Sequence, residues 1–300
     1  MGRKTKDSGV DGLLLIDKPA GWTSHDVVAK CRGVYGQRRC GHAGTLDPDA
    51  TGVLLIGFGN VTKLLTFLTD LPKTYTTDMV MGSTTKTLDD SGEVVQRFAM
   101  PSLSLERLQS TAQQFVGNIL QIPPMVSAVQ VGGVRLHELA RQGIEIERAP
   151  RPVTVYRYDV VSTLDNNVFG AEIVCGSGTY VRTLVDDLGR AMGGGAHLRN
   201  LRRTAVGSFL ADGGDSPLRE GFGDRPLVSP AETLRDYPAV TIDDDIAARI
   251  RNGVVFDRDQ FGTGKTVGPQ RVLESSGELL AVYESAGQRF RPLVVLPRRE

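Results

Sequence analysis

The sequence predicts an α+β fold built on a mixed or antiparallel sheet, followed by a small β-rich domain. Short apolar runs typical of strands are interspersed with fewer amphipathic helical stretches. Most predicted strands follow one another as hairpin neighbours, rather than alternating regularly with helices. A stretch at 211–230 is rich in Gly, Asp and Pro, which indicates a linker before the last strands. We therefore expect a large domain over 10–235 and a small one over 236–300.

The first half of the chain contains clear start signals for helices and strands. Continuous apolar runs predict buried strands, and Ser or Asn ahead of an apolar periodic stretch predicts a helix N-cap. The expected elements are a strand over Gly12–Ile16, a helix from the N-cap Ser24 to about Val34, a helix capped by Asn60, a strand over Lys73–Gly82, renewed strand character at Val94, and a helix over Leu105–Val116 capped by Ser104.

The second half contains the clearest helix, over Thr179–Met192, with Val181, Leu184 and Leu188 at helical spacing before a triplet of glycines. The other expected elements are strands over Val126–Val131, Val153–Val161 and Val168–Cys175, a short helix over Arg135–Arg141, two short strands within Leu198–Phe209 joined at Thr204, a helix over Ile242–Ile250, and strands over Val267–Val272, Leu279–Tyr283 and Arg291–Leu296.

Composition is that of an ordinary globular protein. Its 300 residues, 40% hydrophobic and 23% charged, can bury about three quarters of the unfolded surface. No apolar run approaches the roughly 20 residues of a membrane span. The first nine residues are polar and lack an apolar core, so we do not expect them to form a signal peptide. Three cysteines without a CxxC pair argue against zinc and disulfide scaffolds, and they predict a cytoplasmic protein with reduced thiols.

The net charge is zero, which argues against nonspecific coating of nucleic acid but leaves a local basic groove open. Arginines cluster at 38–39, 148–157 and 199–203. Each cluster by itself is typical of a solvated surface. Together they are the candidate contacts to a polyanion.

The stretch Gly41–Leu55 is the candidate site. Three glycines and Pro48 surround the carboxylate of Asp47, and the apolar run Val53–Ile56 predicts a strand behind them. Glycine permits left-handed backbone, and a proline biases the preceding residue away from helix. A carboxylate on such a rigid loop suits a nucleophile or a base. An Asp-Pro turn without chemistry is the alternative on composition alone.

The string from Gly41 to Leu54 resembles the signature of the TruB family of tRNA pseudouridine synthases. Other motifs resemble the family's in the same order, from about Leu13 to Phe209: Asp17–Ser24, Lys73–Tyr75, the spaced residues Gly82, Thr85, Thr87, Asp89 and Gly92, Gln121–Pro124 with Ser127–Ala128, Gly176–Leu184, and Leu201–Thr204. The chain departs from the family at Gln130, often lysine, and at His137, often tyrosine. Both departures lie outside the catalytic motifs.

The resemblance implies a pseudouridine synthase catalytic domain with a long, mostly antiparallel mixed sheet over 10–235, and a PUA-like RNA-binding domain over 236–300. It implies isomerisation of the T-loop uridine, position 55 of tRNA, to pseudouridine on a flipped-out base. We expect no cofactor, no metal and no membrane association, the tRNA T-arm stem-loop as partner, and a monomer without an obligatory protein partner. A noncatalytic RNA-binding or tRNA-folding module and a guide-RNA-dependent synthase are the alternatives.

The resemblance also implies roles for individual residues. Asp47 is the expected nucleophile, by addition at C6, by assisting departure from C1′, or through a glycal, and the sequence does not choose among them. Arg182 is expected to keep Asp47 ionised through a planar pairing. Tyr75 offers a ring for stacking and a hydroxyl for relay of the C5 proton. The other candidates contact RNA or shape the pocket: His42 fills the gap left by the flipped base, Tyr180 orients Asp47 or Arg182, Leu201 forms an apolar wall, Lys18 shapes the site, and Arg202 contacts the RNA backbone.

Overall fold

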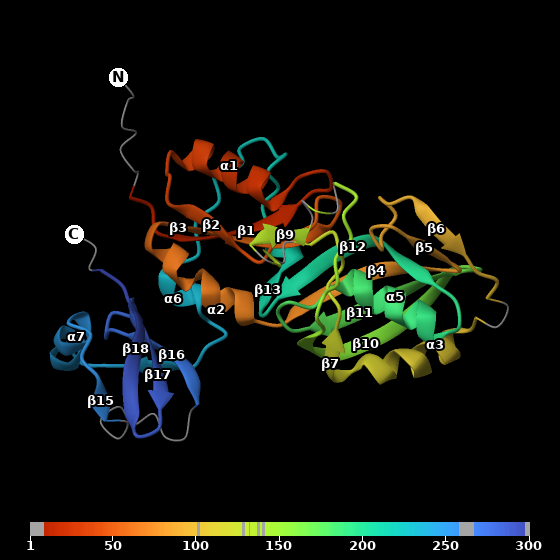
Figure 1. Ribbon diagram of the computed structural model, residues 1–300. Helices are drawn as coiled ribbons and strands as arrows, with labels where there is room; N and C mark the ends of the chain where they lie inside the picture. Colours follow the sequence, from red (N-terminus) through yellow and green to blue (C-terminus); the bar gives the residue numbers. More distant parts are fainter. Residues whose placement is uncertain are drawn as a thin grey trace. The chain divides into compact units, whose positions relative to one another are not determined.

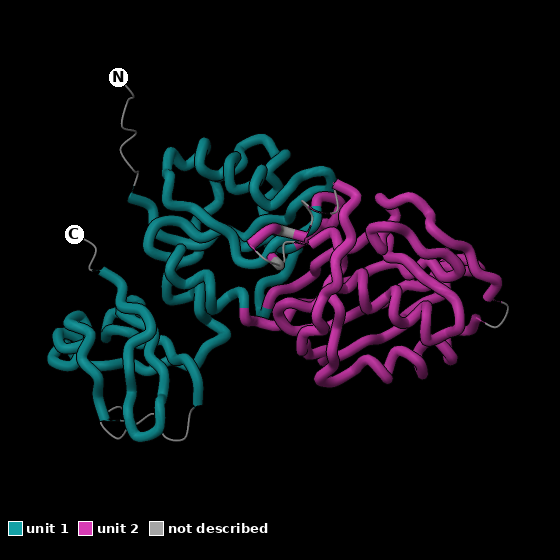
Figure 2. Tube along the Cα trace, viewed as in Figure 1, with its two compact units in different colours: residues 1–47, 53–69, 207–300 teal, residues 48–52, 70–206 magenta. Residues whose placement is uncertain are grey.

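The computed structural model describes residues 9–100, 103–127, 130–131, 133–136, 139, 142–257 and 267–297. It divides into two compact units (Figure 2), each assembled from separate stretches of chain. Unit 1 comprises residues 1–47, 53–69 and 207–300, and unit 2 comprises residues 48–52 and 70–206. Much of the predicted helix over Arg135–Arg141, including His137, lies outside the described residues.

Unit 1 begins with the predicted strand β1 (Gly12–Lys18) and helix α1 (Ser24–Tyr35). A hairpin follows, in which β2 (Cys40–Ala43) pairs antiparallel with β3 (Thr51–Phe58). The side chains of Val53–Ile56 are fully buried, as expected for a strand that anchors a loop. A 3₁₀ helix (Gly59–Leu64) then leads into α2 (Leu65–Asp70).

Two predicted helix caps in unit 1 are wrong. The N-cap of α1 is Thr23, which forms a capping box with Asp26, whereas Ser24 is the first helical residue and is buried. Asn60 lies within the 3₁₀ helix, and its backbone N–H donates to the carboxylate of Asp11. In both cases the residue forms hydrogen bonds with a partner distant in the sequence, Leu46 for Ser24 and Asp11 for Asn60. A local sequence pattern does not reveal such a partner.

The predicted linker is also wrong over part of its length. Asp215 is fully buried, its N–H donates to the carbonyl of Leu15, and its carbonyl accepts from the N–H of Asp17. Leu13 and Val228 exchange two further backbone hydrogen bonds. The stretch therefore supplies backbone partners to β1, and a short helix, α6 (Pro230–Thr233), follows it.

Unit 2 contains an antiparallel sheet in the order β12-β4-β11-β10-β7. Its strands are β4 (Lys73–Met81), β7 (Gly117–Gln121), β10 (Arg151–Asp165), β11 (Val168–Cys175) and β12 (Ala196–Val206). Thr51 and Gly52, which begin β3, pair parallel with β12 and make the sheet mixed. Helices α3 (Leu105–Ala112) and α5 (Val181–Ala191) contact each other and lie over this sheet (Figure 1).

Small hairpins accompany the main sheet of unit 2. They pair β5 (Ser83–Thr85) with β6 (Val94–Arg97), and β8 (Gln130–Val131) with β9 (Val134–Arg135). Of the strand predicted over Val126–Val131, residues 126–127 lie in a bend, residues 130–131 form β8, and residues 128–129 lie outside the described residues. The two strands predicted within Leu198–Phe209 are mainly one strand, β12, which continues through Thr204 with irregularities in its register; β13 (Phe209–Leu210) follows it.

The C-terminal stretch forms a separate five-stranded sheet in the order β14-β16-β17-β18-β15. Its elements are β14 (Ala239–Thr241), α7 (Asp244–Arg251), β15 (Phe256–Asp257), β16 (Gly268–Leu273), β17 (Leu279–Ala286) and β18 (Arg289–Val295). Tyr283 and Phe290 anchor its own apolar cluster. The predicted α+β class, with a mixed sheet and a β-rich C-terminal domain, is confirmed. Among the described residues, no helix is long and apolar enough to cross a membrane.

Candidate active site

The sequence-predicted site residues belong to both units. Lys18, His42 and Asp47 lie in unit 1, whereas the remaining candidates lie in unit 2: Tyr75, Tyr180, Arg182, Leu201 and Arg202. Because Asp47 and Arg182 lie in different units, their ion pair stays a prediction.

The backbone next to Asp47 is held by a buried hydroxyl. The Oγ of Ser24 accepts a hydrogen bond from the N–H of Leu46 (2.9 Å) and lies 3.2 Å from the Leu46 carbonyl oxygen, to which it donates. Gly44 adopts a φ of +80°, the left-handed geometry that favours glycine. Asp47 itself is half-buried. The loop thus has a fixed main chain and a carboxylate that is not sealed from solvent.

Lys18 and His42 flank this loop in the sequence. Lys18 is fully buried, and its ammonium donates to the carbonyls of Pro19 (2.9 Å) and Trp22 (2.7 Å). These bonds support the site-shaping role that the resemblance implies, since they fold the segment leading into α1. His42 lies on β2 and is half-buried. The exposed ring of His25 meets it edge-on, with ring centroids 5.5 Å apart.

Gly52 permits the parallel pairing of β3 and β12. Its φ is +102°, and a Cβ at this position would fall on the backbone carbonyl of Arg203. No other residue fits so close an approach of two main chains. The neighbouring Arg202 is half-buried, with Nη1 3.4 Å from the Oγ1 of Thr51. The signature glycine therefore joins the start of β3 to the strand that carries Arg202.

Tyr75 lies on β4, an interior strand of the sheet in unit 2. On β4 it is opposite Ile173 of β11 and Arg203 of β12, and it is 9% exposed. Lys73 is buried on the same strand, two residues away. Burial, and then the nearby positive charge of Arg203, lowers the pKa of Lys73 to about 8. The surroundings of Tyr75 thus include cationic side chains shielded from solvent.

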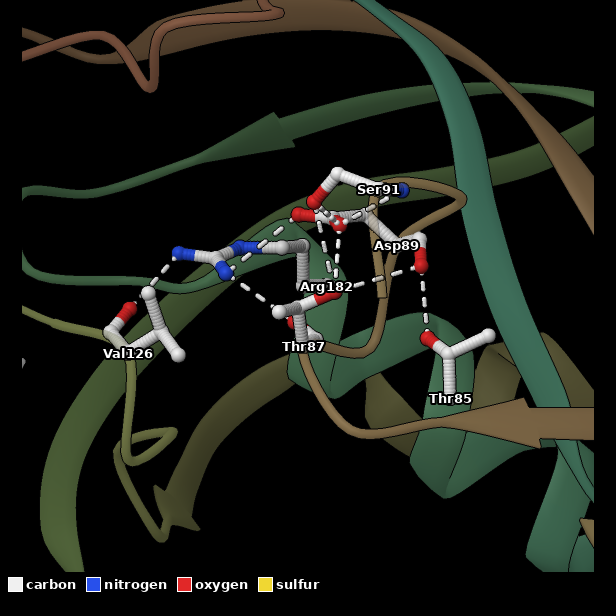
Figure 3. A network of polar contacts seen from close by, with 6 residues as sticks. All are labelled: Thr85, Thr87, Asp89, Ser91, Val126 and Arg182. Atoms are coloured by element: carbon white, nitrogen blue, oxygen red, sulfur yellow. Dashed lines mark hydrogen bonds and ion pairs between the residues drawn. The ribbon is translucent and has the colours of Figure 1, made fainter. Parts of the chain in front are cut away.

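Arg182 is a buried cation, and Figure 3 shows three of its partners among the described residues. Its guanidinium donates to the carbonyls of Thr87 (3.0 Å) and Val126 (2.9 Å), and its Nη1 lies 3.4 Å from the Oδ2 of Asp89. Val126 lies in a bend rather than the predicted strand, and this bend directs its carbonyl to Arg182. The main-chain and carboxylate oxygens compensate for the desolvation that burial of a guanidinium costs.

Asp89 is held by hydroxyls on both sides of it in the sequence. Thr87 and Ser91 donate to its Oδ1 (2.6 and 2.5 Å), and Thr85 donates to its carbonyl oxygen (2.6 Å). Leu88 between them has a positive φ of 62°, an uncommon geometry for a leucine. The Thr-x-Thr-x-Asp pattern was visible in the sequence, and the structure explains it as the support for Arg182.

Tyr180 and Leu201 lie at points where the backbone changes direction. Tyr180 is the N-cap residue of α5, and the buried amide of Gln121 accepts from its N–H (2.8 Å) and donates to its carbonyl (3.1 Å). Leu201 is half-buried where the register of β12 shifts, after Asn200 with a φ of 55°. Such bulges commonly re-aim side chains beside active sites.

Three residues hold the candidates in place through contacts that the sequence did not predict. Ser24 contacts the backbone next to Asp47, Gln121 contacts the backbone of Tyr180, and Asp89 contacts Arg182. All three were part of motifs that resemble the family's. Their roles depend on partners that lie 22, 59 and 93 residues away in the sequence. The sequence alone therefore showed only that these residues belong to the motifs.

Comparison with known proteins identifies the class. Residues 32–181 match the model of the "TruB family pseudouridylate synthase (N terminal domain)", and residues 182–217 match the "tRNA pseudouridylate synthase B C-terminal domain". These matches place the chain among the pseudouridylate synthases.

Similar proteins cover most of the chain. The tRNA pseudouridine synthase B of Heliobacterium modesticaldum is 44% identical over 82% of this chain and 81% of its own. That of Mycobacterium tuberculosis is 37% identical over 95% of each. The chain therefore belongs to the TruB family.

Solved structures agree with this fold. A chain of a Cbf5-Nop10-Gar1 complex matches with a TM-score of 0.72 at 23% identity, over 95% of this chain and 84% of that chain. A chain of an H/ACA RNP bound to a substrate RNA containing 2′-deoxyuridine matches with a TM-score of 0.70 at 21% identity, over 96% of this chain and 86% of that chain. At these identities the likeness concerns the fold alone.

Proposed function

We propose that this protein isomerises the T-loop uridine at position 55 of tRNA to pseudouridine, with Asp47 as the nucleophile. One observation carries the proposal: relatives called tRNA pseudouridine synthase B match 82–95% of the chain at 37–44% identity. The half-buried carboxylate on a fixed loop supports this role for Asp47.

The reaction breaks the bond between N1 of the base and C1′ of the sugar, and it forms a bond from C5 to C1′. The base loses the proton on C5 and gains one on N1, so the sum is an isomerisation without oxidant or group donor. The target uridine must leave its stack, at a cost of a few kcal/mol. In our proposal Tyr75 stacks on the extruded base and Leu201 forms an apolar wall beside it, while His42 occupies the gap in the RNA.

A fixed cation is needed because a carboxylate in a closed, apolar pocket loses its charge by desolvation. We assign this role to Arg182, whose guanidinium is always protonated. The carbonyls of Thr87 and Val126 and the carboxylate of Asp89 limit its motion. Tyr180, two residues before it, is proposed to help orient the pair.

The RNA contacts are assigned to the arginine clusters and the C-terminal sheet. Arg202 contacts the RNA backbone in this proposal, while Lys18 acts indirectly through the loop carbonyls that it binds. We assign the five-stranded sheet over Ala239–Val295 as a PUA-like RNA-binding domain. We further propose a monomer that acts in the cytoplasm, in keeping with the three free, buried cysteines.

The test is to map pseudouridine in unmodified T-arm stem-loop RNA after incubation with the purified protein alone. We expect product at position 55 and none with the Asp47→Asn variant or with RNA carrying cytidine at that position. RNA binding without product, under conditions in which a known synthase is active, would support the noncatalytic module. Product that requires an added guide RNA would support the guide-dependent alternative.

A further inference from the structure

We propose that Ser24 is a positioning residue for Asp47, acting through the peptide that joins Leu46 to Asp47. The inference rests on the proposed function, because it assigns Ser24 a part in bringing the nucleophile to the uridine. Ser24 opens α1 and lies 22 residues before Leu46 in the sequence. Its hydroxyl makes both of its described bonds to that one residue.

The two bonds use both capacities of the hydroxyl. The Ser24 Oγ accepts from the N–H of Leu46 (2.9 Å) and donates to its carbonyl oxygen (3.2 Å), as a hydroxyl with one proton and two lone pairs permits. The pair of bonds fixes the main chain of Leu46 on both sides of its Cα. A single bond would leave one of these peptide planes free to turn.

The second bond reaches Asp47 through the covalent geometry. The carbonyl of Leu46 and the amide nitrogen and Cα of Asp47 belong to one peptide unit, which is planar. Holding the carbonyl oxygen therefore sets the plane on which the Asp47 Cα lies. On the other side of Asp47, Pro48 disfavours helical backbone for the residue before it. The nucleophile is thus constrained from both directions while its side chain remains half-buried.

Burial makes this contact hard to replace. Ser24 is 1% exposed and Leu46 is 4% exposed, so bulk water has little access to either partner. Removing the hydroxyl would leave the N–H and carbonyl of Leu46 without these two partners in a buried place, which favours a change of backbone rather than simple rehydration. A displacement of about 1 Å at a reacting group is enough to cost about 10²-fold in rate.

The adjacent Thr23 provides a matched control. Its hydroxyl accepts from the backbone N–H of Asp26 (3.0 Å) and donates to the Asp26 carboxylate (2.7 Å), in the capping box of α1. Thr23 is exposed and has no described bond to the loop of Asp47. Loss of this hydroxyl should weaken the helix without moving the nucleophile.

The experiment compares Ser24→Ala, Ser24→Thr and Thr23→Ala in single-turnover pseudouridine formation at saturating T-arm RNA, with separate measurement of RNA Kd and Tm. We expect Ser24→Ala to slow the reaction about 10- to 100-fold with Kd within twofold of wild type. Ser24→Thr, which keeps the hydroxyl, should recover most of the rate. Thr23→Ala should lower Tm and leave the rate within twofold.

Amide hydrogen exchange gives a readout independent of activity. Because the N–H of Leu46 is bonded to Ser24, its exchange should accelerate at least tenfold in Ser24→Ala and remain unchanged in Thr23→Ala. A wild-type reaction rate in Ser24→Ala would overturn the inference. So would an equal loss of rate in Ser24→Ala and Thr23→Ala when the two variants have the same Tm. Unchanged amide exchange at Leu46 in Ser24→Ala would overturn it as well. Absence of product from wild type itself would instead count against the proposed function.

Discussion

The segment that carries Asp47 and the network around Arg182 are held in opposite ways. Before Asp47, a neutral hydroxyl holds the main chain, and the carboxylate remains half-buried. At Arg182, a residue that is 3% exposed, the contacts go to the charged guanidinium itself. The difference matches the proposed roles. A nucleophile must stay accessible to substrate, so its backbone is fixed, whereas a permanent cation acts from a buried position and its charge is fixed directly.

The contrast also separates two kinds of sensitivity. Where neutral hydrogen bonds hold the backbone, a variant that removes a donor or acceptor lowers the stability. The loss per bond is small when water can take the place of the missing group. Supports for a buried charge respond to any change of charge nearby, since an unpaired ion in the interior is costly. Variants in the two regions should therefore differ in whether rate, stability or pH dependence changes.

The largest effect is expected at the nucleophile. Asp47→Asn keeps the size of the side chain and removes its charge, so pseudouridine formation should fall by at least about 10⁴-fold. RNA Kd should stay near the wild-type value, because the backbone support by Ser24 is untouched. Single-turnover assays with T-arm RNA and a filter-binding Kd measure the two effects. Substantial turnover by the variant would remove Asp47 from the nucleophilic role.

Arg182→Lys should have the next largest effect. Lysine keeps the charge but cannot make the forked contacts that the guanidinium makes to Thr87 and Val126. We expect the rate at saturating RNA to fall about 10²-fold, with a smaller change in Kd, measured at neutral pH. Arg190→Lys on the same helix, where the side chain is 66% exposed, is the matched control and should be near wild type. Near-normal turnover of Arg182→Lys would show that these contacts are dispensable.

Asp89→Asn should lower stability more than a surface change does. It removes the negative partner of a buried guanidinium while leaving an amide of the same size, so we expect a loss of about 1–3 kcal/mol in the free energy of unfolding. Urea unfolding measures it. Asp90→Asn is the control, because that side chain is exposed and adjacent in the sequence. Equal stability of the two variants would contradict the charge-support assignment.

The smallest effect at neutral pH concerns Lys73. Burial holds its pKa in the folded protein at about 8, below the 10.5 of a solvated lysine. Between these pH values the unfolded chain binds more protons, so stability rises with pH. Lys73→Met should lack this rise, which amounts to roughly 3 kcal/mol at most. Urea unfolding at pH 7.5 and pH 10 measures the difference from wild type. Lys63→Met, at an exposed position, should keep the rise in stability. The same change in the free energy of unfolding between pH 7.5 and pH 10 in both variants would refute the assignment.

Features that depend on neighbouring residues were predicted well. The apolar run before Lys18 and the alternation along Lys73–Met81 are strands, and the helical spacing of Val181, Leu184 and Leu188 lies on α5. The cap of α3 at Ser104 is confirmed by its bond to the N–H of Arg107. These patterns reflect side-chain periodicity, which each element sets locally.

Features that depend on distant partners were not predicted. The composition of the stretch at 211–230 predicts a linker, but in the structure its backbone forms hydrogen bonds with β1. Thr204 suggested a break, yet β12 continues through it because β4 provides partners on both sides of the irregularity. Ser24 was predicted as an N-cap because it precedes an apolar periodic stretch. Its hydroxyl instead bonds to the buried carbonyl and N–H of Leu46.

The sequence by itself determined the mixed α+β class, the identity of the candidate residues and their grouping into motifs that resemble one family. Only the tertiary structure decided what holds those residues: a hydroxyl on the peptide before Asp47, an amide on Tyr180, and a carboxylate with two carbonyls on Arg182. The physical reason is that residue type sets chemical capacity, whereas a buried hydrogen bond needs a partner that only the folded chain brings within about 3 Å.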